Sequence, residues 1–264
     1  MEDILLRDAH YVVVDIETTG YRPANDEILE IAAVHWHKGQ ELEHFQSLIK
    51  PENKIPEDSI SIHNITDEMV KDAPGLEDVL IRFLQFIKNK ILVFHNAQFD
   101  KKFINYNLQR LGMSLLDDNV VDTLKISRRL YPRISHALTD LSERLRLDHA
   151  NKHRAYADAY CTAQLLDILI NDLEREEYYF VSEVIKFKKK KKDLLEIFLP
   201  QIEEAIKKNS FIEIEYRLLK IIVVRRIIKP LEIIFEDKEK ILKYIYKGKV
   251  KSLNLNKLVF ICQI

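Results

Sequence analysis

The sequence YVVVDIETTG, residues 11–20, is the clearest indication of how the chain begins to fold. Its run Tyr11–Ile16 is rich in β-branched residues and nearly all apolar, which predicts a strand buried on both faces of a sheet. Asp15 and Glu17 stand two positions apart, so on a strand they point to the same face. Such a pair can simply end a strand at the surface, or it can form part of a site. The pair alone does not decide between these two interpretations.

Two further acidic residues lie downstream in similarly informative contexts. Asp100 follows the apolar run Ile91–His95 in ILVFHNAQFDKKF, and Asp158 lies in HRAYADAYCTAQ. An acid in a first helical turn also complements the helix dipole, so the strand before Asp100 is what suggests a function. If that strand and the strand of Asp15 are parallel neighbours, the two carboxylates meet at one end of the sheet. Clustered carboxylates repel one another unless cations lie between them, and hard ions such as Mg²⁺ or Mn²⁺ suit oxygen ligands.

His153 completes this set. It stands five residues before Asp158, which on one continuous helix would place the two side chains roughly 140° apart. We therefore expect Asp158 on a helix and His153 in the preceding loop. There it can act as a general base on a water that a paired-metal site activates. The predicted metal ligands are Asp15, Glu17, Asp100 and Asp158, and the predicted catalytic residues are His153 and Glu17, the latter also touching the terminal 3′-hydroxyl.

Size and composition indicate a soluble chain of one large domain or two smaller ones. It has 264 residues, 47% of them hydrophobic, and a mean hydropathy of −0.20. No apolar run approaches the ~20 residues that span a bilayer, and the charged N-terminus is not a secretory signal. Cys161 falls on an apolar helical face, where a reduced buried thiol is expected. These features predict a cytoplasmic protein without a membrane partner.

The charge pattern and the grammar of the sequence both change along the chain. Residues 1–172 hold 20 Lys and Arg against 28 Asp and Glu, and residues 173–264 hold 21 against 14. Alternating strand and helix signals over 1–173 predict an α/β domain with one mixed sheet flanked by helices. Residues 174–199, with the run Lys188–Lys192, predict a charged helical linker. Short strands over 200–264 predict a small all-β barrel or sandwich.

Several local elements can be predicted individually. His37-Lys38-Gly39-Gln40 is a hairpin turn between two strands, with Gly39 free to adopt positive φ. Asp122 is placed to cap a helix over Thr123–Leu130. In the second half, a helix over about Gln201–Lys208 precedes the strands. The next strands include two separate ones at Ile221–Ile228 and Leu231–Phe235.

At this point a family resemblance can be stated. Residues 9 to 172 resemble the DEDD superfamily of 3′→5′ exonucleases, in particular the histidine subtype that includes the epsilon proofreading subunit of bacterial replicative polymerases. The resemblance is carried by DIETTG, HNAQFDKKF and HRAYADA, with SIHNITDEMVKDAP and VVDTLKISRRLYP between them. In the tyrosine subtype an aromatic residue lies four positions before the last acid, where this chain has Arg154.

The resemblance implies a ribonuclease H-like fold, an active enzyme and a nucleic-acid partner. Its cofactors would be two Mg²⁺ or Mn²⁺ ions. Nothing in the sequence indicates a polymerase partner. The substrate-contacting residues expected are Thr18, Thr19, His63, Asn96 and Phe99.

The last 65 residues resemble the WYL domain, a small SH3-like β-barrel of bacterial regulators of nucleic-acid metabolism. AIKKNSFIEIEY, RRIIKPLEII and KSLNLNKL carry this resemblance. The three residues that name that family are replaced here by Ile241-Leu242-Lys243. Lys251 and Lys257 keep the basic character of the final strands and are the predicted accessory contacts to nucleic acid. Packing or dimerisation is the alternative role for this barrel.

The sequence thus predicts a metal-dependent 3′→5′ exonuclease that hydrolyses single-stranded DNA to nucleoside monophosphates. Two alternatives stay open at this stage. One is an RNA-trimming exoribonuclease, because contacts to the 2′-hydroxyl cannot be read from the sequence. The other is a regulator whose exonuclease fold only binds nucleotides. Cleavage that depends on a metal ion distinguishes this regulator from both enzymes.

Overall fold

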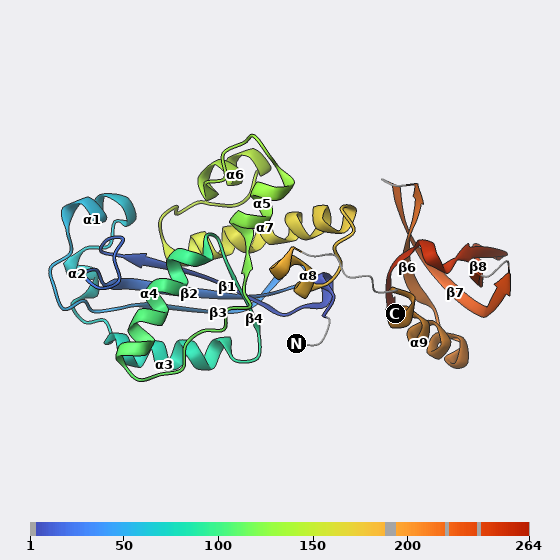
Figure 1. The fold of residues 1–264 in the computed structure, drawn as a ribbon, viewed down its shortest axis with the longest axis horizontal. Coiled ribbons are helices and arrows are strands. Elements are labelled where there is room, and N and C mark those ends of the chain that lie inside the picture. The colour runs from blue at the N-terminus through green and yellow to red at the C-terminus, as the bar shows by residue number, and fades with distance from the viewer. Residues whose placement is uncertain (1–3, 188–193, 220–221, 237–238, 264) are drawn as a thin grey trace. The chain divides into compact units, whose positions relative to one another are not determined.

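The structure is a computed structural model that describes residues 4–187, 194–219, 222–236 and 239–263 (Figure 1). The chain divides into two compact units, residues 1–189 and 190–264, called here the N-terminal and C-terminal units. None of the helices in the described residues is long and apolar enough to cross a bilayer. Each unit has its own five-stranded sheet, and the two are described separately.

The N-terminal sheet has the strand order β3-β2-β1-β4-β5. β1 lies at its centre, antiparallel to β2 and parallel to β4. β3 extends the antiparallel edge, and β5 extends the parallel one. The mixed sheet predicted from the sequence is therefore confirmed. The strands are β1 (Tyr11–Thr18), β2 (Ile28–His37), β3 (Gln40–Leu48), β4 (Ile91–Phe94) and β5 (Val121–Asp122).

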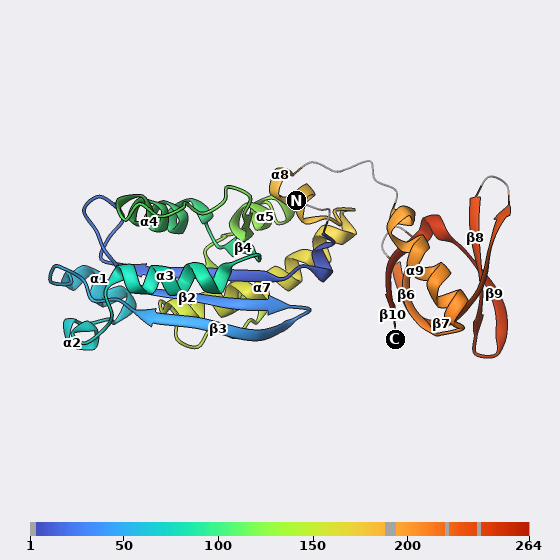
Figure 2. The ribbon, with the colours of Figure 1, turned by 90° about the horizontal axis from the view of Figure 1, so that it is seen from below.

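Helices lie on both faces of this sheet (Figures 1 and 2). Val13 and Val34 pack on one face with apolar residues of α7, and Val12 and Val14 pack on the other with residues of α3 and α4. This alternation explains why β1 is apolar at nearly every position. The helices are the 3₁₀ turn η1 (Leu6–Asp8), α1 (Glu57–His63), α2 (Asp67–Val70), α3 (Leu76–Ile87), α4 (Ala97–Arg110), α5 (Thr123–Leu130), α6 (Leu138–Leu145), α7 (Ala155–Arg175) and α8 (Val181–Lys186).

The predicted local signals are confirmed in this unit. Lys38 and Gly39 both have positive φ, 49° and 79°, as the two-residue hairpin between β2 and β3 requires. The Asp122 carboxylate accepts hydrogen bonds from the backbone N–H groups of Leu124 and Lys125 and so caps α5. The free thiol of Cys161 is buried, and burial raises its pKa to about 12.

The segment after α7 belongs to the packing of the N-terminal unit. Phe180 is buried and forms an antiparallel bridge with Leu5, and Val181 and Val184 are buried in the core on the α7 side. These residues lie within 174–199, where the sequence predicted a charged helical linker. The predicted lysine run, Lys188–Lys192, lies outside the described residues.

The C-terminal unit has the open strand order β10-β6-β7-β8-β9. No pairing joins β9 to β10 among the described residues, so the closed SH3-like barrel expected from the sequence is not confirmed. Apolar residues of α9, including Phe198 and Ile202, are buried in this unit. Its elements are α9 (Leu194–Lys208), β6 (Ile212–Leu219), β7 (Ile222–Glu236), β8 (Glu239–Tyr246), β9 (Lys249–Asn254), the 3₁₀ turn η2 (Leu255–Lys257) and β10 (Leu258–Gln263).

Two boundaries in this unit differ from the prediction. The separate strands expected at Ile221–Ile228 and Leu231–Phe235 are one strand, β7. Its first part pairs with β6 and its second part with β8, and the register shifts between Pro230 and Glu232. A proline is tolerated at such a bulge. α9 also begins before the predicted helix and contains Pro200.

Candidate active site

Three of the four predicted metal ligands converge at one point. Asp15 and Glu17 point from β1 to the α7 side of the sheet, and Asp158 lies in the first turn of α7. Ligand oxygens of these three carboxylates all lie within 4.8 Å of one another. Elements distant in sequence thus place three negative groups where one ion could touch them all, and the donor set is entirely oxygen, as Mg²⁺ and Mn²⁺ prefer.

Asp100, the fourth predicted ligand, is buried at the start of α4, beside this cluster. Burial raises the pKa of Asp100 to about 8, against hydrogen bonds from its own backbone and that of Ile16, while nearby Asp158 adds to the increase. Burial also raises the pKa of Glu17 to about 8, helped by Asp158 and Glu30. The pKa of Asp15 is raised in the same way, by burial first and then by Asp100. Without cations the cluster therefore retains protons, which is the expected behaviour of a cation site.

His153 lies in the loop before α7, as predicted, and Asp158 lies within the helix. The His153 ring is exposed, its φ is 61°, and its backbone N–H lies 3.3 Å from Oδ1 of Asp158. The sequence reasoning missed His149, which is buried and places its Nε2 2.5 Å from the same oxygen. Its only signal in the sequence was a second histidine shortly before Asp158.

A second missed feature is the ion pair between Arg154 and Glu30. Glu30 lies on β2 and is completely buried, and it accepts hydrogen bonds from Nε and Nη2 of Arg154 at 3.0 and 2.8 Å. It also accepts hydrogen bonds from Gln46 and from the backbone of Ala155. Burial raises the pKa of Glu30, but these hydrogen bonds outweigh burial and lower it below the usual value. The pair fastens the start of α7 to the centre of the sheet.

A cleft of about 520 Å³ opens beside Glu17. It is lined by four of the predicted substrate contacts, Thr18, Thr19, His63 and Phe99. It also includes Tyr21, which the sequence reasoning missed: its side chain is 77% exposed and its ring lies edge-on to Phe99, with centroids 6.3 Å apart. The cleft thus offers hydroxyl groups, an imidazole and two aromatic rings within reach of the carboxylates.

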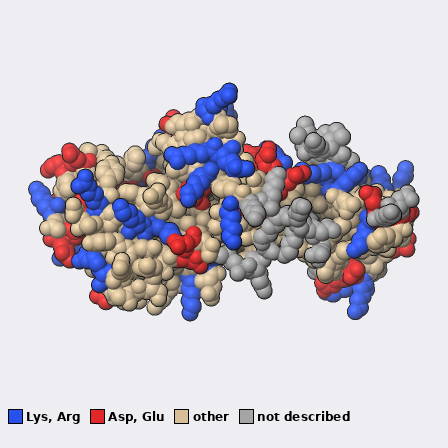
Figure 3. Space-filling model, in the orientation of Figure 1, with Lys and Arg blue, Asp and Glu red and all other residues tan. Residues whose placement is uncertain are grey.

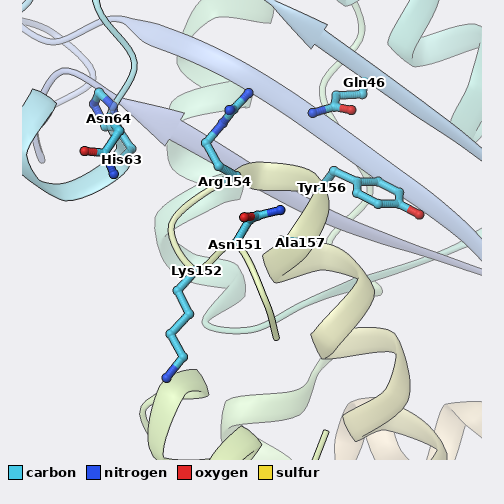
Figure 4. A pocket seen from close by; sticks show the side chains of 8 residues that line it. All are labelled: Gln46, His63, Asn64, Asn151, Lys152, Arg154, Tyr156 and Ala157. Atoms are coloured by element: carbon cyan, nitrogen blue, oxygen red, sulfur yellow. The ribbon is translucent and has the colours of Figure 1, made fainter. Parts of the chain in front are cut away.

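His63 also faces a second pocket of about 490 Å³, on the other side of the loop that carries His153 (Figure 4). Its Nδ1 accepts a hydrogen bond from the backbone N–H of Ile65, so in the neutral ring Nε2 carries the hydrogen. This buried Nε2 has no hydrogen-bond partner among the described residues. Arg154 and Lys152 line the same pocket, which therefore presents donors and positive charge.

Two groups of predicted residues stand apart from these pockets. Asn96 is exposed at the start of α4 with a φ of 79°, and it lines neither of them. Lys251 and Lys257 belong to the C-terminal unit and are exposed. Lys251 lies near the ring of Tyr246, 5.8 Å from its centroid, and Arg226 lies over the same ring at 4.7 Å. We call Arg226, Tyr246 and Lys251 the basic–aromatic cluster.

The surface charge of the N-terminal unit is mixed on the face that Figure 3 shows. Lysine and arginine side chains alternate there with acidic ones. The acidic excess of residues 1–172 is therefore not a uniformly negative surface on this face. The clustered carboxylates of β1, α4 and α7 account for part of that excess.

Comparison with known proteins was decisive for the family. The family model described as Exonuclease, RNase_T, matches residues 12–166. The chain belongs to this exonuclease family. It is a 3′→5′ exonuclease of the DEDD superfamily, with the ribonuclease H-like fold, and it acts on nucleic acid. Exonucleases of this superfamily use divalent metal ions, which agrees with the carboxylate cluster.

Individual relatives of this exonuclease place it more closely. It is 38% identical over 171 residues to "DNA polymerase III PolC-type" from Streptococcus suis, an alignment that covers 64% of this chain and 12% of that protein. The chain thus spans about an eighth of the length of the relative. It resembles a solved structure of exonuclease X in complex with 5′ overhanging duplex DNA (TM-score 0.54, 27% identity), covering 67% of this chain and 98% of that one.

A third comparison extends beyond the exonuclease unit. Exonuclease I of E. coli in complex with a dT13 oligonucleotide matches with a TM-score of 0.57 and 15% identity. That alignment covers 97% of this chain and 66% of the other. At this identity the match concerns the fold alone.

Proposed function

We propose that this exonuclease is a metal-dependent enzyme of the histidine subtype that degrades single-stranded DNA from its 3′ end to nucleoside monophosphates. The observation that carries the proposal is the convergence of Asp15, Glu17 and Asp158, whose ligand oxygens lie within 4.8 Å of one another. The raised pKa values of Glu17 and Asp100 support it, because they show how strongly the cluster lacks positive charge.

In the proposed mechanism these three carboxylates, together with Asp100, hold two Mg²⁺ or Mn²⁺ ions. When bound, such ions lower the pKa of a water molecule and neutralise charge on the phosphate and the departing 3′ oxygen. His153 removes the proton from the attacking water, which its position in the exposed loop before α7 allows. Glu17, in addition to binding metal, accepts a hydrogen bond from the terminal 3′-hydroxyl.

The 3′-terminal nucleotide occupies the cleft beside Glu17 in this proposal. Tyr21 and Phe99 provide aromatic faces on which bases stack, an interaction worth about 1–3 kcal/mol per base. Thr18 and Thr19 contribute hydroxyl groups, and the unpartnered Nε2–H of His63 donates to the sugar or phosphate. Asn96, which lines neither pocket, contacts the strand outside this cleft.

Two comparisons favour DNA and a single strand. The curated relative is a DNA polymerase, and E. coli exonuclease I was solved with dT13, which cannot pair with itself. A cleft that stacks bases needs them unpaired, which agrees with a single strand. The free, buried thiol of Cys161 fits the reducing environment of the cytoplasm, where we place the enzyme.

The C-terminal unit, in this proposal, grips the strand outside the active site. The basic–aromatic cluster combines the two features of sequence-independent binding, cationic groups for phosphates and an aromatic ring for a base. Lys257 adds a further exposed cation. We retain the WYL-like character of this unit as part of the proposal, on the motifs that carry it.

The decisive experiment compares single-stranded DNA, duplex DNA and RNA of one sequence, each labelled at its 5′ end, with Mg²⁺, with Mn²⁺ and with EDTA. We expect stepwise shortening of the single-stranded DNA from the 3′ end, release of mononucleotides and no cleavage in EDTA. Asp158→Ala should abolish cleavage without unfolding the protein. Faster digestion of RNA would assign the enzyme to RNA trimming, and binding without cleavage in any metal would make it a nucleotide-binding regulator.

A further inference from the structure

Three histidines gather at the end of the sheet remote from the carboxylates. His10 immediately precedes β1, and His35 and His37 lie two residues apart at the end of β2. Tyr11 pairs with Trp36 across β1 and β2, so the three histidines share one face of the sheet. At ~3.3 Å per strand residue, His10 lies about 16 Å along the chain from Asp15. This histidine cluster is therefore separate from the catalytic site.

The rings are in direct contact. Nδ1 of His10 lies 2.9 Å from Nε2 of His35, and the His10 ring stacks on that of His37 with centroids 4.0 Å apart and planes 3° apart. His35 is buried, His37 is half-buried and His10 is exposed. Burial lowers the pKa of His10, and His37 and His35 lower it further, so this imidazole is neutral at pH 7.

The partners of the outer ring nitrogens determine which nitrogens carry lone pairs. Nδ1 of His35 lies 3.1 Å from a carboxylate oxygen of Glu43, and Nδ1 of His37 lies 3.2 Å from the carbonyl oxygen of Ala9. Both partners only accept, so both Nδ1 atoms carry hydrogen, and in the neutral rings Nε2 is the free donor of electrons. A histidine that ligates a metal is typically oriented in this way, with its other N–H held by a carboxylate or a backbone carbonyl.

We propose that His10, His35 and His37 bind a transition-metal ion, Zn²⁺ by preference, through Nδ1 of His10 and Nε2 of His35 and His37. Two imidazole nitrogens on a tetrahedral zinc, at bonds of 2.0–2.1 Å, lie about 3.3 Å apart. The observed 2.9 Å between His10 and His35 needs to widen by only about 0.4 Å.

Two local rearrangements complete the site. His10 moves its hydrogen from Nδ1 to the water-exposed Nε2, which needs no net change of charge. Because its ring is stacked parallel to His37, one of these two rings also has to turn, and the exposed ring of His10 is the one free to do so. The nearby cations are compensated, because Lys90 pairs with Glu43 at 3.4 Å and Lys38 pairs with Asp8 at 3.3 Å.

Such an ion would fasten the entry to β1 onto the hairpin of β2 and β3. It binds the folded chain far better than the unfolded one, so it adds to stability in proportion to the logarithm of its concentration. The inference concerns metal content and stability and does not depend on the proposed cleavage reaction.

The test uses the full chain carrying Asp15→Asn and Asp158→Asn, which disables the catalytic cluster, dialysed against Zn²⁺ with Mg²⁺ in excess. We expect one Zn²⁺ per chain and a rise in melting temperature. His10→Gln or His35→Gln should weaken binding at least tenfold, His37→Gln should weaken it as well, and His44→Gln, an exposed histidine of β3, should leave it unchanged. Co²⁺ should give the visible absorption of a tetrahedral nitrogen site.

Circular dichroism establishes first that each variant folds. If His35→Gln does not fold, His10→Gln decides the question, because that side chain is exposed. Zinc binding of equal affinity in His10→Gln and in the parent chain, or no zinc binding at all, would overturn the inference.

Discussion

Nε2 of His149 lies 2.5 Å from Oδ1 of Asp158, and its Nδ1 lies 3.1 Å from the hydroxyl of Ser142. That hydroxyl donates its own hydrogen to the carbonyl of Thr139 at 2.7 Å, so it accepts from Nδ1–H of His149. The buried histidine is thus fixed by α6 and in turn fixes the carboxylate on α7. Asp158 is oriented before any ion arrives.

We expect His149→Phe, which keeps a ring in the same space, to weaken metal binding or activity by about 10–100-fold, as removal of the partner behind a metal ligand usually does. The measurement is the Mn²⁺ concentration that gives half-maximal cleavage. His44→Phe, at an exposed site, is the control. An unchanged Mn²⁺ requirement in His149→Phe would show that this hydrogen bond is only structural.

The second prediction concerns the stability of the metal-free protein as a function of pH. The pKa of Glu17 rises from 4.5 to about 8, and that of Asp100 from 3.8 to about 8. Between these values the folded state binds more protons than the unfolded state, so the free energy of unfolding falls as pH rises towards 8. Urea denaturation in EDTA at several pH values should show this decline.

Glu17→Gln is the variant that isolates the effect, because histidines with lowered pKa values, such as His63 and His95, act in the opposite direction below pH 6.5. The variant should lose stability less steeply than wild type as pH rises, and saturating Mn²⁺ should make the two proteins more alike. Parallel stability curves in EDTA would contradict the assignment of repulsion to this cluster.

His153→Ala should reduce the rate of cleavage by about 10²–10⁴-fold, the usual contribution of a positioned general base. Because the ring itself makes no contact with the carboxylates, the Mn²⁺ requirement and the melting temperature should stay close to those of wild type. A histidine that instead ligates the metal would be revealed by a large increase in the Mn²⁺ needed for activity.

Arg154→Met should destabilise the protein by about 3–5 kcal/mol, because it leaves a completely buried carboxylate without its partner. Combining it with Glu30→Gln should recover much of this stability, since the double variant buries no unpaired charge. Chemical denaturation of the two single variants and the double variant forms the cycle. If the double variant were no more stable than Arg154→Met, the ion pair would not be the cause.

The last prediction separates the two units. Residues 1–187 should cleave short oligonucleotides nearly as fast as the whole chain. They should bind long strands more weakly and with a shallower dependence on salt, by about 0.7 in the log–log slope for each phosphate that the C-terminal unit would neutralise. Lys251→Ala with Lys257→Ala in the whole chain should shift it part of the way. Equal affinities and slopes for the fragment and the whole chain would exclude a nucleic-acid grip in the C-terminal unit.

The choice of fragment depends on residues whose burial the sequence did not reveal. Phe180 and Val184 lie in a strongly charged stretch, and a linker was the natural interpretation. Both are nonetheless buried, and Phe180 bridges to Leu5. Ending the fragment before them would expose part of the core. Pairing between distant segments of this kind leaves no periodic pattern in either segment.

Other features were predictable because their causes are local. The alternation of β1 placed Asp15 and Glu17 on one face, and the cap at Asp122 and the turn at Gly39 depend on neighbouring residues only. The partners of His149 and Arg154 could not be predicted, because each joins elements whose approach is set by tertiary packing. Pro230 misled for a related reason, since a bulge between two partner strands accommodates it.

The loop that carries His153 is held at both ends, by His149 on Asp158 and by Arg154 on Glu30. Only residues 150–153 lie between these two anchors. Motions of such short loops take about nanoseconds to microseconds, much less time than a typical enzymatic turnover. We therefore expect the base to reach the reacting water and return to solvent many times in each cycle. The proton it removes can then leave directly to bulk water, so that proton release does not limit the rate of digestion.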